Sequence, residues 1–187
     1  MNKTQLFAGL LLGSALSFST AIIASEVVFT EDFSGDFSNW VGKEVEVETL
    51  KGSQLQNLNV LSKIVDDPMR EGKKAAQSTV KVFGGDFISQ QIFSPGKYSL
   101  SFDYMGTCKR DCGGTVGYGE DFPGVKHHWL AGTTRAFPQG LQDNTNWNRY
   151  TINFNAKYEF HLIFEQWTDS IGEEGTVFFA DISLTKH

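Results

Sequence analysis

The stretch Gln90 to Tyr104, QQIFSPGKYSLSFDY, constrains the fold of this chain more than any other segment. Its second half alternates without a break, with Tyr98, Leu100, Phe102 and Tyr104 on one side and small or polar residues between them. A period of two with aromatic residues on one face indicates a half-buried β-strand. Pro95-Gly96 before it is typical of a turn, because proline presets φ and glycine tolerates positive φ. We therefore expect a hairpin: a strand ending at 90–93, a tight turn and a core strand.

Alternation of polar and apolar residues recurs along most of the chain. It predicts further strands within 27–31, 43–49, 55–65, 77–83, 148–155, 158–164 and 176–184. No stretch carries the apolar stripe of an amphipathic helix. Roughly eight to ten short strands separated by turn residues predict an all-β fold, an antiparallel β-sandwich or jelly roll. The length of 187 residues suits a single domain.

The composition supports this fold class and argues against one class of partner. Aromatic residues make up 13% of the chain, and it contains 16 Phe and 19 Gly but only 4 Pro. Richness in aromatic residues and glycine, without helical patterns, favours strands. The formal net charge of −6 argues against nucleic acid as a partner, because an acidic surface repels phosphates.

Residues 1–24 have the pattern of a secretory signal peptide and are expected to lie outside the fold. Lys3 gives a short positive start, Leu6 to Ile23 is mostly apolar, and Ala24-Ser25 follows. The alternative is an uncleaved N-terminal anchor, although the apolar run is short for a membrane span. No second apolar run is long enough to cross a membrane. We therefore expect a secreted or periplasmic protein with a β-sandwich domain over 26–187.

The region 107–134 breaks the regular strand pattern. Seven glycines and both cysteines fall between Met105 and Thr134, without sustained alternation. A structureless loop of this length inside a compact domain is usually either functional or misassigned. We interpret the region as a glycine-rich insertion that contains one short strand around 115–118.

Cys108 and Cys112 are the only cysteines. A C-x-x-x-C pair in an exported chain favours a local disulfide. The bond would close a very short loop, so its entropic effect on global stability is small. The alternative is a zinc site with His127 and His128, since two cysteines and two histidines are suitable ligands. Adjacent histidines on an extended segment point to opposite sides, however, which favours the disulfide.

Three groups of residues resemble a known family. They are Glu31-Asp32-Phe33 followed by Trp40, the middle stretch ISQQIFSPGKYSLSFDY, and the closing NWNRYTINF and VFFADISL. Together they are similar to the jelly-roll carbohydrate-binding modules of bacterial glycanases, within the galactose-binding-like β-sandwiches, over most of residues 27–185. The resemblance implies non-catalytic binding of a polysaccharide or other glycan. Its motifs are strand and turn patterns, and the region 107–134 has no counterpart among them.

The same resemblance implies a structural calcium ion that joins the first and last strands. The carboxylates at matching places are Glu31 or Asp32 and Asp181. Calcium takes several oxygen ligands, which can include backbone carbonyls. The acidic residue that usually follows the opening phenylalanine is replaced by Ser34, and the alternative role of Asp181 is a bond to a backbone group at the strand end.

Glycan binding also requires suitable aromatic residues, because a ring stacks on the flat C–H face of a sugar while polar side chains bond its hydroxyls. The candidate ligand-binding residues are Trp129 as the stacking ring, with Tyr118, Phe122 and His128 near it in the sequence, and Trp167 between the last two strands. Packing in the core is the alternative role for each tryptophan.

An enzyme is the alternative class of function. Glycosidases need two carboxylates across a cleft, and the chain has several, including Glu120, Glu165 and Asp169. None of them stands in a recognisable catalytic motif. Three interpretations stay open: a secreted glycan-binding module, a structural or adhesive matrix protein, and a polysaccharide lyase or hydrolase.

Overall fold

The computed structural model describes residues 25–45, 53–56, 62–79, 85–108, 112–120, 126–134, 136–168 and 175–187. The strands in chain order are β1 (Glu26–Glu31), β2 (Trp40–Val45), β3 (Ser53–Gln56), β4 (Ser62–Asp66), β5 (Lys74–Thr79), β6 (Gly85–Ser89), β7 (Gly96–Gly106), β8 (Cys112–Glu120), β9 (Lys126–Gly132), β10 (Gln139–Gly140), β11 (Asn148–Ala156), β12 (Phe160–Thr168) and β13 (Thr176–Lys186). Helices are absent from these described ranges, which therefore contain no helix able to span a membrane. The all-β prediction is confirmed, while the signal-like residues 1–24 lie outside the described residues.

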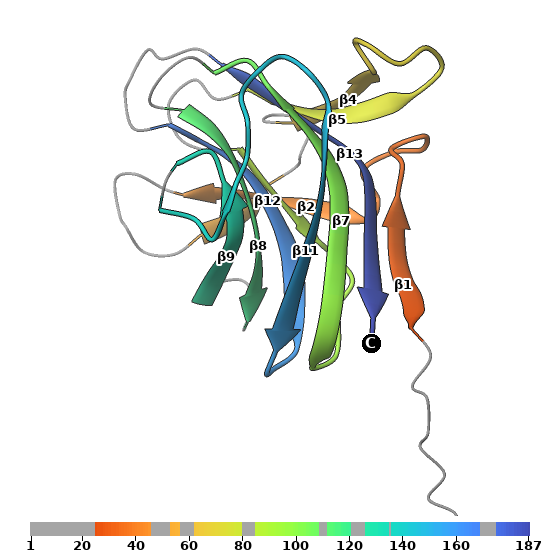
Figure 1. Ribbon diagram of the computed structural model, residues 1–187, viewed down its shortest axis with the longest axis vertical. Coiled ribbons are helices and arrows are strands. Elements are labelled where there is room, and N and C mark those ends of the chain that lie inside the picture. Colours follow the sequence, from red (N-terminus) through yellow and green to blue (C-terminus); the bar gives the residue numbers. More distant parts are fainter. Residues whose placement is uncertain are drawn as a thin grey trace, which may run out of the picture.

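The strands form two sheets that pack face to face (Figure 1). Sheet A has the strand order β11-β7-β13-β5-β4, and β1 also pairs with β13. Sheet B has the order β10-β9-β8-β12-β6-β2-β3. The pairings are antiparallel apart from the short parallel contact of β10 with β9. The predicted antiparallel β-sandwich is therefore correct.

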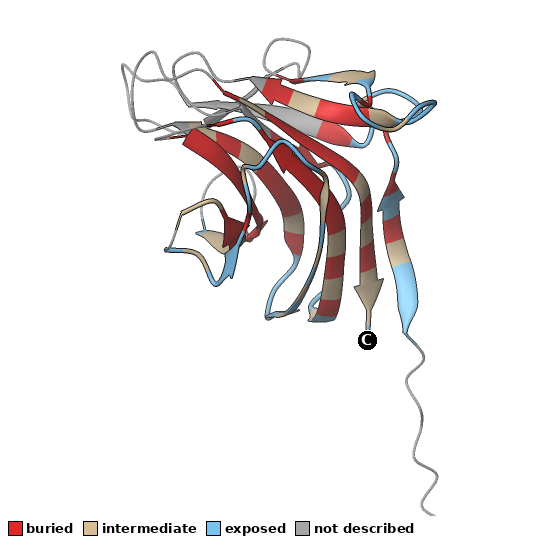
Figure 2. Ribbon diagram, turned by 45° about the horizontal axis from the view of Figure 1, so that its top comes forward, coloured by how far each residue is buried: buried red, intermediate tan, exposed pale blue. Residues whose placement is uncertain are grey.

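Strand β7 confirms the alternation that predicted it. Tyr98, Leu100, Phe102 and Tyr104 are almost fully buried between the sheets. From the other sheet the Phe164 ring packs edge-on against Phe102, with ring centroids 5.8 Å apart. Figure 2 shows that buried residues concentrate in the central strands of both sheets. Each large apolar side chain removed from water in this way contributes about 1.5–3 kcal/mol, so the aromatic core holds the sandwich together.

The predicted hairpin around Pro95-Gly96 is wrong. Strand β6 ends at Ser89 in sheet B, whereas β7 belongs to sheet A. Residues 90–95 cross from one sheet to the other, and on the way Phe93 exchanges backbone hydrogen bonds of 2.9 and 3.0 Å with Phe160. A period-two pattern shows which face a side chain takes, but it does not show which strand lies alongside.

The described part of the region 107–134 contributes two strands, β8 and β9, to sheet B. Strand β8 is longer than the short strand predicted at 115–118, and it lies between β12 and β9. Strand β9 was not predicted. Strand β8 lacks an alternating pattern because glycine occupies several of the positions where a polar side chain would normally mark the outer face. In β9 the pattern is lost for another reason: Trp129 faces outward, and the register against β8 shifts beside it. Tyr118, His128 and Trp129 thus lie on the sheet itself.

Candidate ligand-binding face

Strand β8 gives sheet B two unlike faces. Val116 and Tyr118 belong to the core between the sheets. Because side chains alternate along a strand, Thr115, Gly117 and Gly119 point to the outer face. The outer face of β8 therefore carries almost no side-chain atoms of its own.

Neighbouring side chains occupy the space above these glycines. A Cβ at Gly117 would lie 2.5 Å from the backbone oxygen of His128 and 2.9 Å from the ring of Trp129. A Cβ at Gly119 would lie 2.9 Å from Cδ1 of Ile163. Real Cβ atoms do not approach other atoms so closely, so glycine is required for this arrangement, above all at position 117, where one neighbour is backbone.

Trp129 of β9 lies on this outer face. It pairs with Gly117 across the two strands, and it is half-buried. His127 has the same orientation, and the two rings meet edge to face with centroids 5.3 Å apart. The ring is thus held in place from below and from one side.

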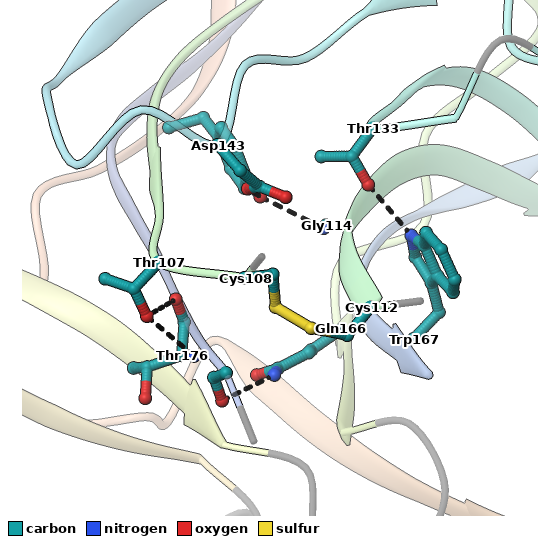
Figure 3. The surroundings of a disulfide bond; sticks show 11 residues. Thr107, Cys108, Cys112, Gly114, Thr133, Asp143, Gln166, Trp167 and Thr176 are labelled. Carbon is teal, nitrogen blue, oxygen red and sulfur yellow. Dashed lines mark hydrogen bonds between the residues drawn. A yellow bond between two sulfur atoms is a disulfide. The ribbon is translucent and has the colours of Figure 1, made fainter. Parts of the chain in front are cut away.

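Two more rings share the outer face. Phe137 packs on Gly132, where a Cβ would lie 2.2 Å from the ring, and Gly132 pairs with Thr115. Trp167 of β12 donates its indole N–H to Oγ1 of Thr133 at 3.2 Å (Figure 3). Like Trp129, both rings are half-buried. We name this set the aromatic face: Thr115, Trp129, Phe137 and Trp167.

Thr115 brings a polar group to the aromatic face. It is only 2% exposed, and its Oγ1 has no hydrogen-bond partner in the described structure. A buried hydroxyl in that state costs about 1–3 kcal/mol. Glu165 lies directly opposite Thr115 on β12 and is half-buried. The rings therefore surround one buried hydroxyl and stand beside a half-buried carboxylate.

Two residues that the sequence grouped with Trp129 lie on the opposite face of sheet B. Tyr118 and His128 stack with ring centroids 4.6 Å apart. The imidazole Nε2 of His128 is 3.3 Å from the carboxylate of Glu120. Burial, together with the charge of Glu120, raises the pKa of Tyr118. A step of one residue along a strand reverses the face, so neither residue joins the aromatic face; Phe122, also a candidate, lies outside the described residues.

A disulfide joins Cys108 and Cys112, as predicted (Figure 3). Cys108 follows the end of β7 in sheet A and Cys112 begins β8 in sheet B, so the bond links the sheets at one end. A Cβ at Gly175 would lie 2.0 Å from the Cys108 sulfur, and Gln166 donates to the carbonyl of Gly175 at 2.8 Å. The zinc alternative is wrong, because both thiols are used in the disulfide.

The residues expected to hold calcium accept hydrogen bonds from the protein. Glu31 accepts the N–H of Phe33 at 2.8 Å and, on its other oxygen, Nδ2 of Asn39 and Nε1 of Trp40 at 3.0 Å each. Asp32 accepts the backbone N–H of Ser34 at 2.9 Å. Hydrogen bonds from Ser34 lower the pKa of Asp32.

Asp181, the third expected ligand, contacts two arginines. Its Oδ2 accepts Nη1 of Arg70 at 3.0 Å, and its backbone oxygen accepts Nη1 of Arg149 at 2.7 Å. In the part of the chain that the structure describes, no three His, Cys, Asp or Glu side chains gather as metal ligands. The arrangement does not fit calcium, which needs several free oxygens; whether the ion binds stays a prediction.

Glu31, Asp32 and Asp181 all line a polar pocket of about 500 Å³. It is lined by Thr30, Glu31, Asp32, Ser34, Gly35, Asp36, Ser38, Asn39, Asp181 and Ile182. Asp36 accepts the backbone N–H of Ser38 at 2.9 Å. None of the lining residues is aromatic, so this pocket has no surface on which a sugar ring could stack. The aromatic face is the better candidate for a glycan.

No protein-family model and no curated protein matches the chain. Several solved structures do match. The CBM22-1-GH10 modules of endo-1,4-beta-D-xylanase 10B from Clostridium thermocellum, solved with xylohexaose, give a TM-score of 0.56 at 13% identity, covering 87% of this chain and 29% of that chain. The CBM22-1 xylan-binding domain from Paenibacillus barcinonensis gives 0.53 at 9% identity, covering 86% of this chain and 94% of that chain.

An enzyme has the same fold. A Stig cyclase from Fischerella sp. TAU gives a TM-score of 0.53 at 11% identity, covering 88% of this chain and 98% of that chain. The chain thus spans less than a third of the xylanase chain, but nearly all of the other two. At such low identity the likeness establishes fold and not activity. This chain has the jelly-roll β-sandwich fold of the carbohydrate-binding modules.

Proposed function

We propose that this protein is a non-catalytic carbohydrate-binding protein that holds a polysaccharide on the aromatic face of sheet B. The observation that carries the proposal is the set of three half-buried rings around a strand whose outward positions are glycine or Thr115. A sugar offers a flat C–H face to such rings. Its hydroxyls lie at the edge of the sugar ring, where the half-buried carboxylate of Glu165 can accept their hydrogen bonds.

The structural neighbours support the same class of ligand. One of them is a xylan-binding domain, and another was solved with xylohexaose. Both ligands are chains of sugar rings, so a binding protein can contact several units at once. Three rings on one face match a ligand of that kind better than they match a single small sugar.

The proposed location is outside the cytoplasm. The signal-like residues 1–24 support it. So does the disulfide between Cys108 and Cys112, since disulfides persist in oxidising compartments and are rare in reducing ones.

The test is binding of the purified protein to a panel of soluble and insoluble polysaccharides, by affinity gel electrophoresis and pull-down. Trp129→Ala, Phe137→Ala and Trp167→Ala should each weaken binding by about one to two decades, if a stacked ring contributes about 1–3 kcal/mol. Tyr158→Ala is the matched control, because Tyr158 is 61% exposed and lies between β11 and β12. Each variant is also melted to show that it remains folded.

The outcomes separate the interpretations. A wild type that binds no polysaccharide contradicts the proposed function. Binding that survives all three ring substitutions contradicts the proposed site. Release of reducing or unsaturated sugars from a bound polysaccharide would favour the hydrolase or lyase alternative.

A further inference from the structure

Two strands, β5 and β1, pair with the same edge of β13, one after the other along its length. Strand β5 pairs with residues 176–179, and β1 pairs with residues 182–186. At the junction β13 has an irregular register against β7, and Asp181 adopts a positive φ of 46°. A non-glycine residue in this region costs about 1 kcal/mol or more. Neighbouring groups must therefore stabilise the junction.

Arg70 reaches this junction from the loop between β4 and β5. Its Nη1 lies 3.0 Å from Oδ2 of Asp181 and 2.5 Å from Oδ2 of Asp103, and its Nε lies 2.5 Å from Oδ2 of Asp67. The guanidinium also stacks on Trp147, 4.4 Å from the ring centroid. One side chain thus contacts the β4–β5 loop, β7, β13 and the segment before β11.

The carboxylates around Arg70 have few oxygens left for another cation. Oδ1 of Asp67 accepts the N–H groups of Met69, Arg70 and Trp147 at 2.9 Å each. Oδ1 of Asp103 accepts Nη1 of Arg149 at 3.0 Å. Counting the contacts of Arg70, five of the six carboxylate oxygens of Asp67, Asp103 and Asp181 accept a hydrogen bond.

Charge and burial are consistent with a cation built into the chain. The side chain of Asp67 is fully buried and that of Asp103 is 12% exposed. Burial acts to raise the pKa of Asp67, but hydrogen bonds from Met69, Arg70 and Trp147 outweigh it and the pKa is lowered. Two buried carboxylates so close together need a positive partner, and Arg70 provides it.

We propose that Arg70 is the cation that joins β7 and β13 to the β4–β5 loop at this junction, and that the fold does not depend on bound calcium. An arginine carries a fixed charge, and its planar fork can reach several carboxylates at once. Calcium would do the same by collecting oxygens from these strands. The oxygens of Glu31, on the β1 side, already accept three N–H groups. The proposal is independent of glycan binding.

The first test uses the wild-type protein. Its melting temperature is measured with millimolar calcium chloride and with excess chelator, and calcium is titrated into it by calorimetry. We expect the same melting temperature in both conditions and no saturable heat. A rise of several degrees with calcium, or stoichiometric binding, would overturn the proposal.

The second test removes the cation. Arg70→Met should lower the melting temperature by roughly 5–15 °C, because it leaves buried carboxylates unpaired. Arg149→Met is the matched control: Arg149 contacts Asp103 and Asp181 too, but it is exposed, so a smaller fall is expected. An Arg70→Met protein as stable as wild type in chelator would contradict the proposal.

A third variant covers the case in which Arg70→Met does not fold. Arg70→Lys keeps the positive charge but lacks the planar fork of the guanidinium. We therefore expect it to fold, with a melting temperature below that of the wild type and the same with or without chelator. A loss of stability that only calcium restores would show that the ion, not Arg70, is the native cation.

Discussion

The two sheets present unlike outer faces. On sheet A, outward side chains bond one another across strands: Ser99 with Asn153 at 2.6 Å, and Ser101 with Thr151 at 2.8 Å. On sheet B, the outward positions of β8 hold glycine and Thr115, whose hydroxyl lacks a partner in the described structure. A ligand on sheet A must displace these existing hydrogen bonds, whereas on sheet B it can stack on the half-buried rings of Trp129, Phe137 and Trp167. The face that carries the rings is the better candidate site, even though the other is more polar.

The largest effect should come from adding a side chain to the outer face of β8. Gly117→Val should destabilise the protein by about 3 kcal/mol, because the backbone oxygen of His128 cannot move out of the way of a Cβ 2.5 Å distant. Urea unfolding measures the loss. Gly119→Ala is the control, since its nearest neighbour is the end of the flexible Ile163 side chain; equal losses would mean that the two glycines do not differ as described.

A contact between the two sheets should give the next effect. Tyr104 of sheet A donates its hydroxyl to Asp143 and accepts the buried N–H of Gly114 in sheet B at 3.0 Å. Tyr104→Phe leaves that N–H without a partner, which should cost about 1–3 kcal/mol in unfolding free energy. Tyr98→Phe, at the other end of β7, serves as control, because its acceptor is the carbonyl of exposed Ser94. A larger loss at Tyr98 would contradict the role of Tyr104.

The same contact predicts a pH dependence. Burial raises the pKa of Asp143 above its ordinary value of 3.8, although the hydrogen bond from Tyr104 opposes this. The folded protein thus holds the proton more tightly, so the stability contributed by Asp143 is full below the ordinary pKa and is lost as the pH rises through the raised one. Asp143→Asn should be more stable than wild type at neutral pH, by a fraction of 1 kcal/mol after solvent screening. Denaturation at several pH values should show the advantage vanish in acid; an advantage that grows in acid would contradict the sign.

The smallest effect should come from the paired face of sheet A. Ser101→Ala combined with Thr151→Val removes one exposed hydrogen bond completely, so stability should change by about 0.5 kcal/mol or less. Binding to a polysaccharide retained by the wild type should not change. Weaker binding in affinity gels would show that sheet A takes part in recognition and would remove the contrast between the faces.

Side-chain alternation predicted the fold class but not the strand neighbours. It identified β7, β11 and β13, where bulky residues face the core and small or polar ones face outward. It failed for β8, because glycines at positions such as 117 and 119 erase the outward half of the pattern. It failed for β9 because Trp129 faces outward beside a register shift. It also led to the wrong prediction of a hairpin between β6 and β7, which lie in different sheets. Alternation carries no information about which strands pair.

The candidate site was found in part. Trp129 and Trp167 were named from the sequence, and both lie on the aromatic face. Tyr118 and His128 were grouped with Trp129 by closeness in sequence, although strand parity places them on the opposite face of sheet B, where Tyr118 is buried. Phe137 was missed because it follows β9 in an irregular segment, where only the tertiary contact with Gly132 reveals its position. If β8 and β9 had been recognised as strands, the alternation of odd and even positions would have placed Tyr118 and Trp129 on opposite faces.

Strands β1 and β13 run side by side, with Glu26 paired to Lys186 and the hydroxyl of Ser25 2.8 Å from Nδ1 of His187 (Figure 1). Ser25 and His187, at the two ends of the sandwich domain, are therefore in contact. A short glycine linker could join these two residues, and new termini could be opened at the exposed turn of Lys157 and Tyr158. Such a circular permutant should keep both sheets. The same closeness would allow the sandwich to be spliced into a surface loop of a host protein without forcing that loop apart.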